Sequence, residues 1–283
     1  MTEAPFPIMK LNTLFPALTE RRIVVGVVHL PALPGAPGYG GSMSQVIDWA
    51  RADTRALIEG GVDGLIVENF GDKPFYGDTV PPETVASMAV ALGAVMEAAS
   101  ARPVGANVLR NDAAAALALC AATGAGFLRV NVHVGAAVTD QGLIQGAAAE
   151  TMRRRQTLCP NAALLADVHV KHATPLGSEP LEQSAIDTWR RGMADGLIVS
   201  GLGTGQAPAA DRVERIRKVL PESVLLLGSG TDETNASELL ACSNGAIVAS
   251  SLKLDGVLEA PVDPERVKRF VGLVHDMGAV SWA

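Results

Sequence analysis

The stretch LLLGSGTDETNASELLACSNGAIVASSLK (residues 225–253) contains two short apolar runs, separated by a glycine turn and a helical segment. The first run ends at Gly228-Ser229-Gly230, and the second ends at Ser250-Ser251. A strand, a turn, a helix and a second strand in this order are typical of a parallel βαβ unit. The stretch therefore predicts two neighbouring parallel strands whose carboxyl ends carry loops rich in glycine and serine.

The same unit repeats along the whole chain. Apolar runs that predict strands lie at 23–30, 64–70, 103–109, 127–133, 163–172, 196–201, 223–230 and 245–252. Helical patterns separate them, so the strands should be parallel and joined by helical crossovers. Eight units without a long additional insertion favour closure into a (β/α)8 barrel, the TIM barrel, over an open doubly wound sheet.

The domain organisation follows from the same pattern. No linker rich in proline or serine divides the chain, which has 283 residues of which 48% are hydrophobic. Barrels of this kind commonly reach that size as one unit. We therefore expect one domain over residues 1–283, with the barrel at 21–283 and a lead-in segment at 1–20 that covers the bottom of the barrel.

The charge balance argues against nucleic acid as a partner. The formal net charge is −7 and the isoelectric point is about 5.3, whereas binding to a phosphate backbone needs a basic surface. The dense basic run Arg153-Arg154-Arg155 lies in a helical context, and we interpret it as a solvent-exposed helix face.

The cysteines and the lengths of the apolar runs indicate the cellular compartment. No apolar run approaches the roughly 18 residues that a membrane span needs, and the first 22 residues lack the continuous apolar region of a secretory signal. Cys120, Cys159 and Cys242 are far apart and odd in number, which indicates reduced thiols. We expect a cytoplasmic protein without a transmembrane segment.

Polar residues gather where the predicted strands end, and the active sites of such barrels lie at those ends. They are His29, Glu68, Asn69, Asn107, Arg110, Arg129, Asn131, His133, Asp167, His169, Lys171 and His172. Residues two apart on a strand share a face. The runs Arg129-x-Asn131-x-His133 and Asp167-x-His169-x-Lys171 are therefore each expected to point into the barrel mouth, because facing apolar helices would be costly.

Carboxylates, histidines and a lysine in one barrel mouth suit proton transfer next to a carbonyl group. Asp167 or Glu68 is the preferred base, and Lys171 is the electrophile or Schiff-base former. His29 or His169 is the acid. The predicted catalytic residues are thus His29, Glu68, Asp167, His169 and Lys171, and the predicted substrate contacts are Asn69, Asn107, Arg129, Asn131 and His133.

Two other interpretations of these residues stay open. Lys171 could form a structural ion pair with Asp167 or Glu68. Alternatively, two histidines and two carboxylates could hold a divalent metal, although no compact ligand motif supports a metal site. The four residues in question are His29, Glu68, Asp167 and His169. No other cofactor is predicted.

The last three strands end in glycine, serine and threonine. Glycines let backbone N–H groups approach an anion, and the loops after strands seven and eight are the usual phosphate site of this barrel. The predicted phosphate-binding residues are Gly201, Gly203, Gly205, Gly228, Ser229, Gly230, Ser250 and Ser251. The alternative is that these glycines serve turns and bind no ligand.

Several motifs, in order along nearly the whole chain, resemble the BtpA/SgcQ family. They are VVGVVHLPALPGAPGYGG (24–41), Glu68-Asn69, GANVLRND (105–112), FLRVNVHVGA (127–136), ADVHVKHA (166–173) and the 225–256 block. The His-Leu-Pro pattern of that family maps onto His29-Leu30-Pro31, and its Asp-x-His-x-Lys run maps onto Asp167, His169 and Lys171. The family is similar to the ribulose-phosphate-binding barrels, which implies a phosphorylated ligand.

The resemblance does not supply a reaction, because BtpA is associated with photosystem I biogenesis and SgcQ with a sugar-utilisation gene set. We expect an enzyme that acts on a small phosphorylated sugar or nucleotide-derived compound, as an isomerase, epimerase or lyase. The alternative is a non-catalytic assembly factor that keeps the barrel. The apolar helices 85–99 and 113–122 could serve a homo-oligomer interface, but burial against the barrel explains them equally well.

Overall fold

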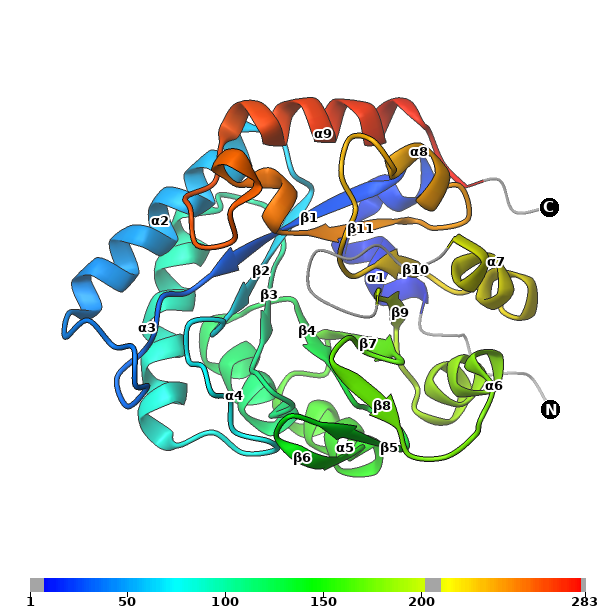
Figure 1. The fold of residues 1–283 in the computed structure, drawn as a ribbon, viewed down its shortest axis with the longest axis horizontal. Helices are drawn as coiled ribbons and strands as arrows, with labels where there is room; N and C mark the ends of the chain where they lie inside the picture. Colours follow the sequence, from blue (N-terminus) through cyan, green and yellow to red (C-terminus); the bar gives the residue numbers. More distant parts are fainter. Residues whose placement is uncertain (1–7, 202–209, 281–283) are drawn as a thin grey trace.

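The computed structural model describes residues 8–201 and 210–280, and it shows a closed barrel of eight parallel strands (Figure 1). Around the barrel the order is β1-β11-β10-β9-β7-β4-β3-β2. The strands are β1 (Ile23–His29), β2 (Gly64–Glu68), β3 (Val104–Asn107), β4 (Phe127–Val130), β7 (Ala163–Val168), β9 (Gly196–Val199), β10 (Leu225–Leu227) and β11 (Gly245–Val248). The predicted TIM barrel and its eight strands are confirmed, and every strand ends before its predicted end.

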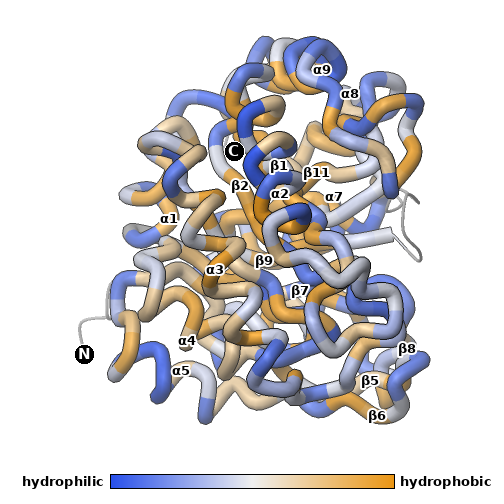
Figure 2. The backbone as a smooth tube through the Cα atoms, turned by 90° about the vertical axis from the view of Figure 1, so that its left-hand side faces the viewer, coloured by the Kyte–Doolittle hydropathy of each residue, from blue (hydrophilic) through white to orange (hydrophobic). Residues whose placement is uncertain are grey.

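Helices surround the barrel on the outside (Figure 1). They are α2 (Met43–Glu59), α3 (Pro82–Ala98), α4 (Ala113–Thr123), α5 (Ala148–Leu158), α6 (Leu181–Ile186) with the π-helical turn η2 (Asp187–Arg191), α7 (Ala210–Val219), the single turn α8 (Ala236–Leu239) and α9 (Pro264–Asp276). Figure 2 shows hydrophobic residues concentrated in the strands and hydrophilic ones on outer helices such as α9. In the part of the chain that the structure describes, no helix is both long and apolar enough to cross a membrane.

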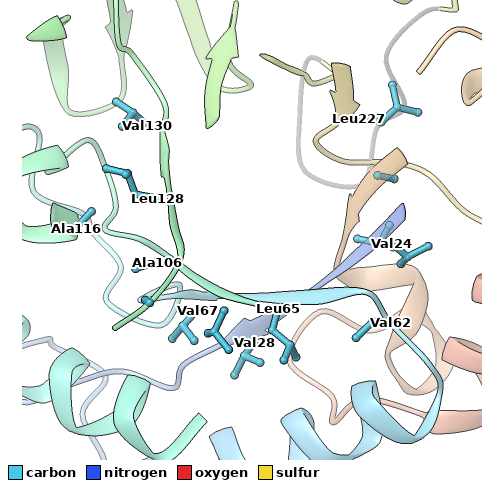
Figure 3. Close-up of a cluster of buried hydrophobic side chains, with 14 of the residues drawn as sticks. Val24, Val28, Val62, Leu65, Val67, Ala106, Ala116, Leu128, Val130 and Leu227 are labelled. Atoms are coloured by element: carbon cyan, nitrogen blue, oxygen red, sulfur yellow. The ribbon is translucent and has the colours of Figure 1, made fainter. Parts of the chain in front are cut away.

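The strands alternate between two buried layers. Val24 and Val28 of β1 pack in the outer layer, between the strands and the helices (Figure 3). Val25 and Val27 pack inside the barrel with Ile66 of β2. The same alternation turns a ring of strand-end residues inward, at the carboxyl end of the barrel: His29, Glu68, Asn107, Arg129, Asp167, Ser200 and Gly228.

The amino-terminal end of the barrel is closed by α1 (Ile8–Leu14) and the 3-10 turn η1 (Pro16–Thr19). Leu11 and Phe15 belong to the apolar cluster inside the barrel, and the rings of Phe15 and Phe127 meet edge to face with centroids 5.7 Å apart. The described part of the predicted lead-in segment therefore packs against the bottom of the barrel.

The expectation of eight units without an insertion is wrong in one respect. The loops after β4 and β7 form a second, three-stranded antiparallel sheet of β5 (Ala136–Thr139), β6 (Gly142–Gln145) and β8 (Ala173–Pro175). Short alternating runs beside a glycine of positive φ, Gly142, allow a tight hairpin. One face of this sheet is buried against the barrel loops through Val132, Ala137, Ile144 and Val170.

The interpretation of the Arg153–Arg155 run as a solvent-exposed face is wrong for Arg155. A helix turns by about 100° per residue, so three consecutive residues cannot all face solvent when one face packs on the barrel. Arg153 and Arg154 are exposed, whereas Arg155 is buried and forms an ion pair with Asp195 just before β9. Asp195 also accepts a hydrogen bond from the Leu164 backbone N–H at 2.7 Å, which ties α5 to β7 and β9.

We predict that Arg155→Met lowers the free energy of unfolding by about 3–5 kcal/mol, because it leaves the Asp195 carboxylate buried without its cation. Urea denaturation followed by circular dichroism measures the loss. The matched control is Arg154→Met, which removes an exposed i,i+4 pair with Glu150 and should cost at most about 0.5 kcal/mol. Equal losses in the two variants would contradict the structural role of the buried pair.

Candidate functional site

A buried ion pair between Arg129 of β4 and Asp167 of β7 lies at the centre of the barrel mouth. Arg129 Nε donates to Asp167 Oδ2 at 2.8 Å, and Nη2 donates to Oδ1 at 2.9 Å. The Arg129 side chain is 3% exposed and the Asp167 side chain is not exposed. Burial disfavours the charged guanidinium, but the carboxylate of Asp167 outweighs burial and raises the pKa of Arg129 above its usual value.

The remaining acceptor sites of Asp167 are also occupied. Asn131 Nδ2 donates to Oδ2 at 3.1 Å, and Ser200 Oγ donates to Oδ1 at 3.1 Å. The carboxylate therefore accepts four hydrogen bonds from three side chains. Such a carboxylate positions Arg129 and Asn131, and it offers no free oxygen to take a proton from a substrate.

Glu68 of β2 is the second carboxylate of the mouth. Its Oε1 accepts from Asn107 Nδ2 at 3.1 Å and from Arg129 Nη1 at 3.3 Å, and its Oε2 lies 3.7 Å from His29 Nε2. Burial favours the neutral acid, but the His29 ring and the Arg129 charge outweigh burial and hold the pKa of Glu68 far below its usual range. Glu68 is thus ionised, and Oε2 keeps an acceptor site next to His29.

His29 connects β1 to the wall of the mouth. Its ring stacks on Phe70, with centroids 4.2 Å apart and an interplanar angle of 17°. Burial lowers the pKa of His29, although Glu68 opposes the shift. Nδ1 has no hydrogen-bond partner among the described residues. A neutral ring beside an ionised carboxylate can accept or pass on a proton.

Lys171 approaches the same cluster from the loop after β7. Burial lowers the pKa of Lys171, and the neighbouring Arg129 lowers it further, against the opposing charges of Glu68 and Asp167. No described residue forms a hydrogen bond or a close ion pair with its ammonium group. The predicted alternative of a direct ion pair with Asp167 or Glu68 is therefore absent from this geometry.

Two cavities have some of these side chains in both of their linings. The inner cavity, about 30 Å³, has His29, Glu68, Arg129 and Lys171 on one side and the loops 228–231 and 249–251 on the other. The outer cavity, about 670 Å³, shares three of these residues with it and opens toward solvent. Its lining is Glu68, Phe70, Lys73, Pro74, Phe75, Asn107, Leu109, Arg110, Arg129, Asn131, Asp140, Lys171, His172 and Leu258.

The loops of the inner cavity carry unused donors. The hydroxyls of Ser229 and Thr231 are buried and have no hydrogen-bond partner among the described residues. Ser251 Oγ donates to the Thr231 carbonyl at 2.8 Å and so links the two loops. Gly230 has a φ of +73°, which lets the chain turn beside Thr231. The arrangement presents hydroxyls at the place where the fold usually holds phosphate.

Two predicted site histidines line neither the inner nor the outer cavity, so the expected alternation is wrong for them. β7 ends at Val168, and His169 has a φ of +52°, which breaks the extended conformation on which alternation depends. Its Nε2 lies 3.0 Å from Ser184 Oγ of α6. His133 follows the end of β4, and its Nε2 contacts the Gly192 carbonyl at 2.8 Å.

Asn69 connects two loops and does not line either cavity. Its Oδ1 accepts from the Leu109 N–H at 2.8 Å, and its Nδ2 donates to Asp72 at 3.0 Å. Of the predicted phosphate residues after β9, Gly201 is buried and lines neither cavity, whereas Gly203 and Gly205 lie outside the described residues. Gly228, Ser229, Gly230, Ser250 and Ser251 all line the inner cavity.

A metal site would require the side chains of His29, Glu68, Asp167 and His169 to converge on one point, and they do not. His169 points to α6, and the Asp167 oxygens are occupied by Arg129, Asn131 and Ser200. Within residues 8–201 and 210–280, no group of three or more histidine, cysteine, aspartate or glutamate side chains has the placement to hold a metal ion.

No role was assigned from the sequence to four groups that the structure places at the cavities. Thr231 follows the glycine turn directly, so its position in the chain was a usable signal. Arg110 lies on the irregular loop after β3, and residues 70–75 lie on the irregular loop after β2. Neither loop has the alternation of polar and apolar residues that predicts which side chains face the mouth. Asp140 reaches the outer cavity from the hairpin between β5 and β6, a sheet that was not expected.

Solved structures share the barrel at low sequence identity. N-(5'-phosphoribosyl)anthranilate isomerase from Pyrococcus furiosus superposes with a TM-score of 0.54 and 13% identity, over 90% of this chain and 99% of that one. A structure described as native KDPGal gives a TM-score of 0.55 and 13% identity, over 89% and 94% of the two chains. Similarity at this level supports the fold and nothing about the reaction.

Sequence relatives are much closer. The photosystem I biogenesis protein BtpA of Synechocystis is 45% identical over 258 residues, 91% of this chain and 90% of that one. An uncharacterized protein of Pyrococcus furiosus is 40% identical, over 92% and 98% of the two chains. An uncharacterized mitochondrial protein of Caenorhabditis elegans is 32% identical, over 92% and 95%. The model of the BtpA family matches residues 20–276, and the chain belongs to that family.

Proposed function

We propose that this chain is an enzyme that acts on a small phosphorylated sugar or nucleotide-derived compound, as an isomerase, epimerase or lyase. One observation carries the proposal. The inner cavity joins hydroxyl-bearing loops after β10 and β11 to His29, Glu68 and Lys171, which are groups for acid–base or nucleophilic chemistry. A phosphate held by the loops would bring the adjoining carbons next to those three side chains.

Phosphate binding is supported by the donors and charges around the inner cavity. Ser229 and Thr231 each bury a hydroxyl without a partner, and a buried polar group without a partner is costly. Lys171 lines the same cavity, and no described carboxylate lies within ion-pair distance of its Nζ. A phosphate would give both hydroxyls an acceptor.

Lys171 is the proposed Schiff-base former. Its lowered pKa increases the fraction of neutral amine near neutral pH. A neutral Nζ can attack a substrate carbonyl carbon, and loss of water then leaves a protonated imine that withdraws electrons from the neighbouring bond. That step suits isomerisation as well as carbon–carbon cleavage, and it requires a group that gives a proton to the departing water.

His29 and Glu68 are the proposed proton carriers. Glu68 Oε2 and His29 Nε2 lie 3.7 Å apart beside Lys171, and both residues line the inner cavity. Asp167, whose oxygens are fully engaged, is proposed to position Arg129 and to leave proton transfer to the pair of His29 and Glu68. Asn107 and Asn131 line the outer cavity and are proposed to contact the substrate.

A non-catalytic assembly role is the second candidate, and the printed name of the Synechocystis relative favours it. The relatives in Pyrococcus furiosus and Caenorhabditis elegans, organisms that do not photosynthesise, favour an activity that is independent of photosystem I. Buried ionisable groups are costly and usually serve a function. The cluster around Lys171 therefore favours the enzyme.

Inorganic phosphate is expected to bind and to raise the melting temperature, since a ligand at 100 times its Kd stabilises by about 2.7 kcal/mol. Ser229→Ala and Thr231→Val should each weaken phosphate binding by about tenfold or more, because each loses a hydrogen bond to a charged group. Thermal shift and isothermal titration calorimetry measure both effects. Ser237→Ala, at an exposed position of α8, is the matched control, and an equal effect in that variant would refute the site.

Lys171 should form a covalent adduct when borohydride reduces a mixture of the protein with ribulose 5-phosphate. Peptide mass spectrometry locates the adduct. Because burial lowers the pKa of Lys171, the adduct should form at a lower pH than an ordinary exposed lysine requires. Lys171→Arg should abolish it, whereas Lys268→Arg, at an exposed position of α9, should leave it unchanged.

The same variants separate the two candidate functions. An enzyme should lose its cellular function on Lys171→Arg or Glu68→Gln while the barrel stays folded, whereas a scaffold for assembly should keep it. Full complementation by both folded variants would remove the enzyme proposal. Turnover by Lys171→Arg without any adduct in the wild type would remove only the lysine role.

A further inference from the structure

Arg110 is a buried cation that the proposed chemistry does not use. It follows β3, is 5% exposed, and lines the outer cavity. Its Nη2 donates to the Lys171 carbonyl at 2.5 Å. Among the described residues, no carboxylate lies within ion-pair distance of its guanidinium group, although Asp140, Glu68 and Asp167 act on it from farther away.

A buried guanidinium group without a carboxylate is unfavourable, because burial removes the hydration energy of the charge and no opposite charge compensates for it. Burial accordingly lowers the pKa of Arg110. The neighbouring Arg129 does not have this problem, since Asp167 and Glu68 both bind it. The difference between the two arginines indicates that the partner of Arg110 is an anionic group of a ligand.

The charges of the outer cavity lead to the same conclusion. Apart from the internally paired Arg129 cluster, its lining contains the cationic side chains of Lys73 and Arg110 and the single carboxylate of Asp140, and Lys171 adds a further positive charge whenever its amine is protonated. The outer cavity therefore has an excess of positive charge. An anionic group of a ligand would balance it.

The loop that carries Arg110 starts on the other side of the mouth from the phosphate loops. β3 and β10 are four strands apart in either direction around the eight-stranded barrel, so the loops that follow them start on opposite sides of the mouth. Strands about 4.8 Å apart and tilted by about 36° close into a barrel about 15 Å across. One small ligand can reach both sides only if its two anionic groups are at opposite ends.

The surroundings of Arg110 fit a carboxylate better than a second phosphate. Phosphate sites gather backbone N–H groups and hydroxyls, but the Arg110 backbone N–H donates to the Tyr76 carbonyl at 2.9 Å. Phe75, Leu109 and Leu258 supply apolar surface to the same cavity. One planar guanidinium group matches one planar carboxylate through two parallel hydrogen bonds.

We propose that the substrate of this barrel is a phosphorylated carboxylic acid, whose carboxylate is bound by Arg110 and whose phosphate lies at the opposite end of the molecule. The proposal rests on the proposed function, because it takes the loops after β10 and β11 as the phosphate site. It narrows the substrate class from phosphorylated compounds in general to those with an acid group across the mouth.

The test uses two open-chain six-carbon probes that differ at one end, 6-phosphogluconate and sorbitol 6-phosphate. Isothermal titration calorimetry on the full chain should show that the acid binds at least tenfold tighter than the alcohol. In R110Q this preference should fall below threefold, while the affinity for sorbitol 6-phosphate stays within twofold. R153Q, an exposed arginine of α5, is the matched control and should keep the full preference.

Retained binding of sorbitol 6-phosphate and inorganic phosphate also shows that R110Q is folded. Equal affinity of the wild type for the acid and the alcohol, or a preference that persists in R110Q, overturns the inference. Tighter binding of fructose 1,6-bisphosphate than of 6-phosphogluconate, dependent on Arg110, overturns it in favour of a second phosphate. In each of these cases phosphate binding at the Ser229 loop stands, whereas the loss of inorganic phosphate binding would remove the proposed function itself.

Discussion

The ion pair between Arg129 and Asp167 is the constraint on which the barrel mouth depends. A guanidinium group inside an apolar barrel is tolerable only when its charge is neutralised and its donors are used, and Asp167 with Glu68 meets both conditions. Asn131 and Ser200 complete the acceptor sites of Asp167. One buried cation thus fixes side chains at the ends of β2, β4, β7 and β9, and Arg129 lines both cavities.

The remaining strands add groups around this fixed centre. β1 and β2 bring the pair of His29 and Glu68, the loop after β7 brings Lys171, and β10 and β11 bring the hydroxyl loops. A barrel allows this division because every strand ends at the same rim, and each loop can change without disturbing the strands. The residues at the strand ends and in the loops after them therefore determine which substrate a barrel binds, and similarity in fold alone does not identify a substrate.

Much of this arrangement could be predicted from the chain, for a reason that particular residues illustrate. His29, Glu68, Asn107, Arg129 and Asp167 each lie on a regular strand, where alternate residues face the same side. The first four line the two cavities, and Asp167 forms an ion pair with Arg129 beside them. His169 and His133 lie beyond the last strand residue, where no period applies. The left-handed conformation of His169 turns its ring to Ser184. The run Asp167-x-His169-x-Lys171, which looks like one strand face in the sequence, therefore does not share one face in the structure.

The sequence by itself determined the eight βα units, the closure into a barrel and the inward residues of the strand ends, because these depend on local periodicity and on short connections. Only the tertiary structure decided that Asp167 is fully engaged, that Arg155 is buried, and that two loops pair into a small antiparallel sheet. It alone placed the buried Arg110 side chain in the outer cavity. Such relations join residues far apart in the chain, and the packing of the whole barrel sets which of them meet.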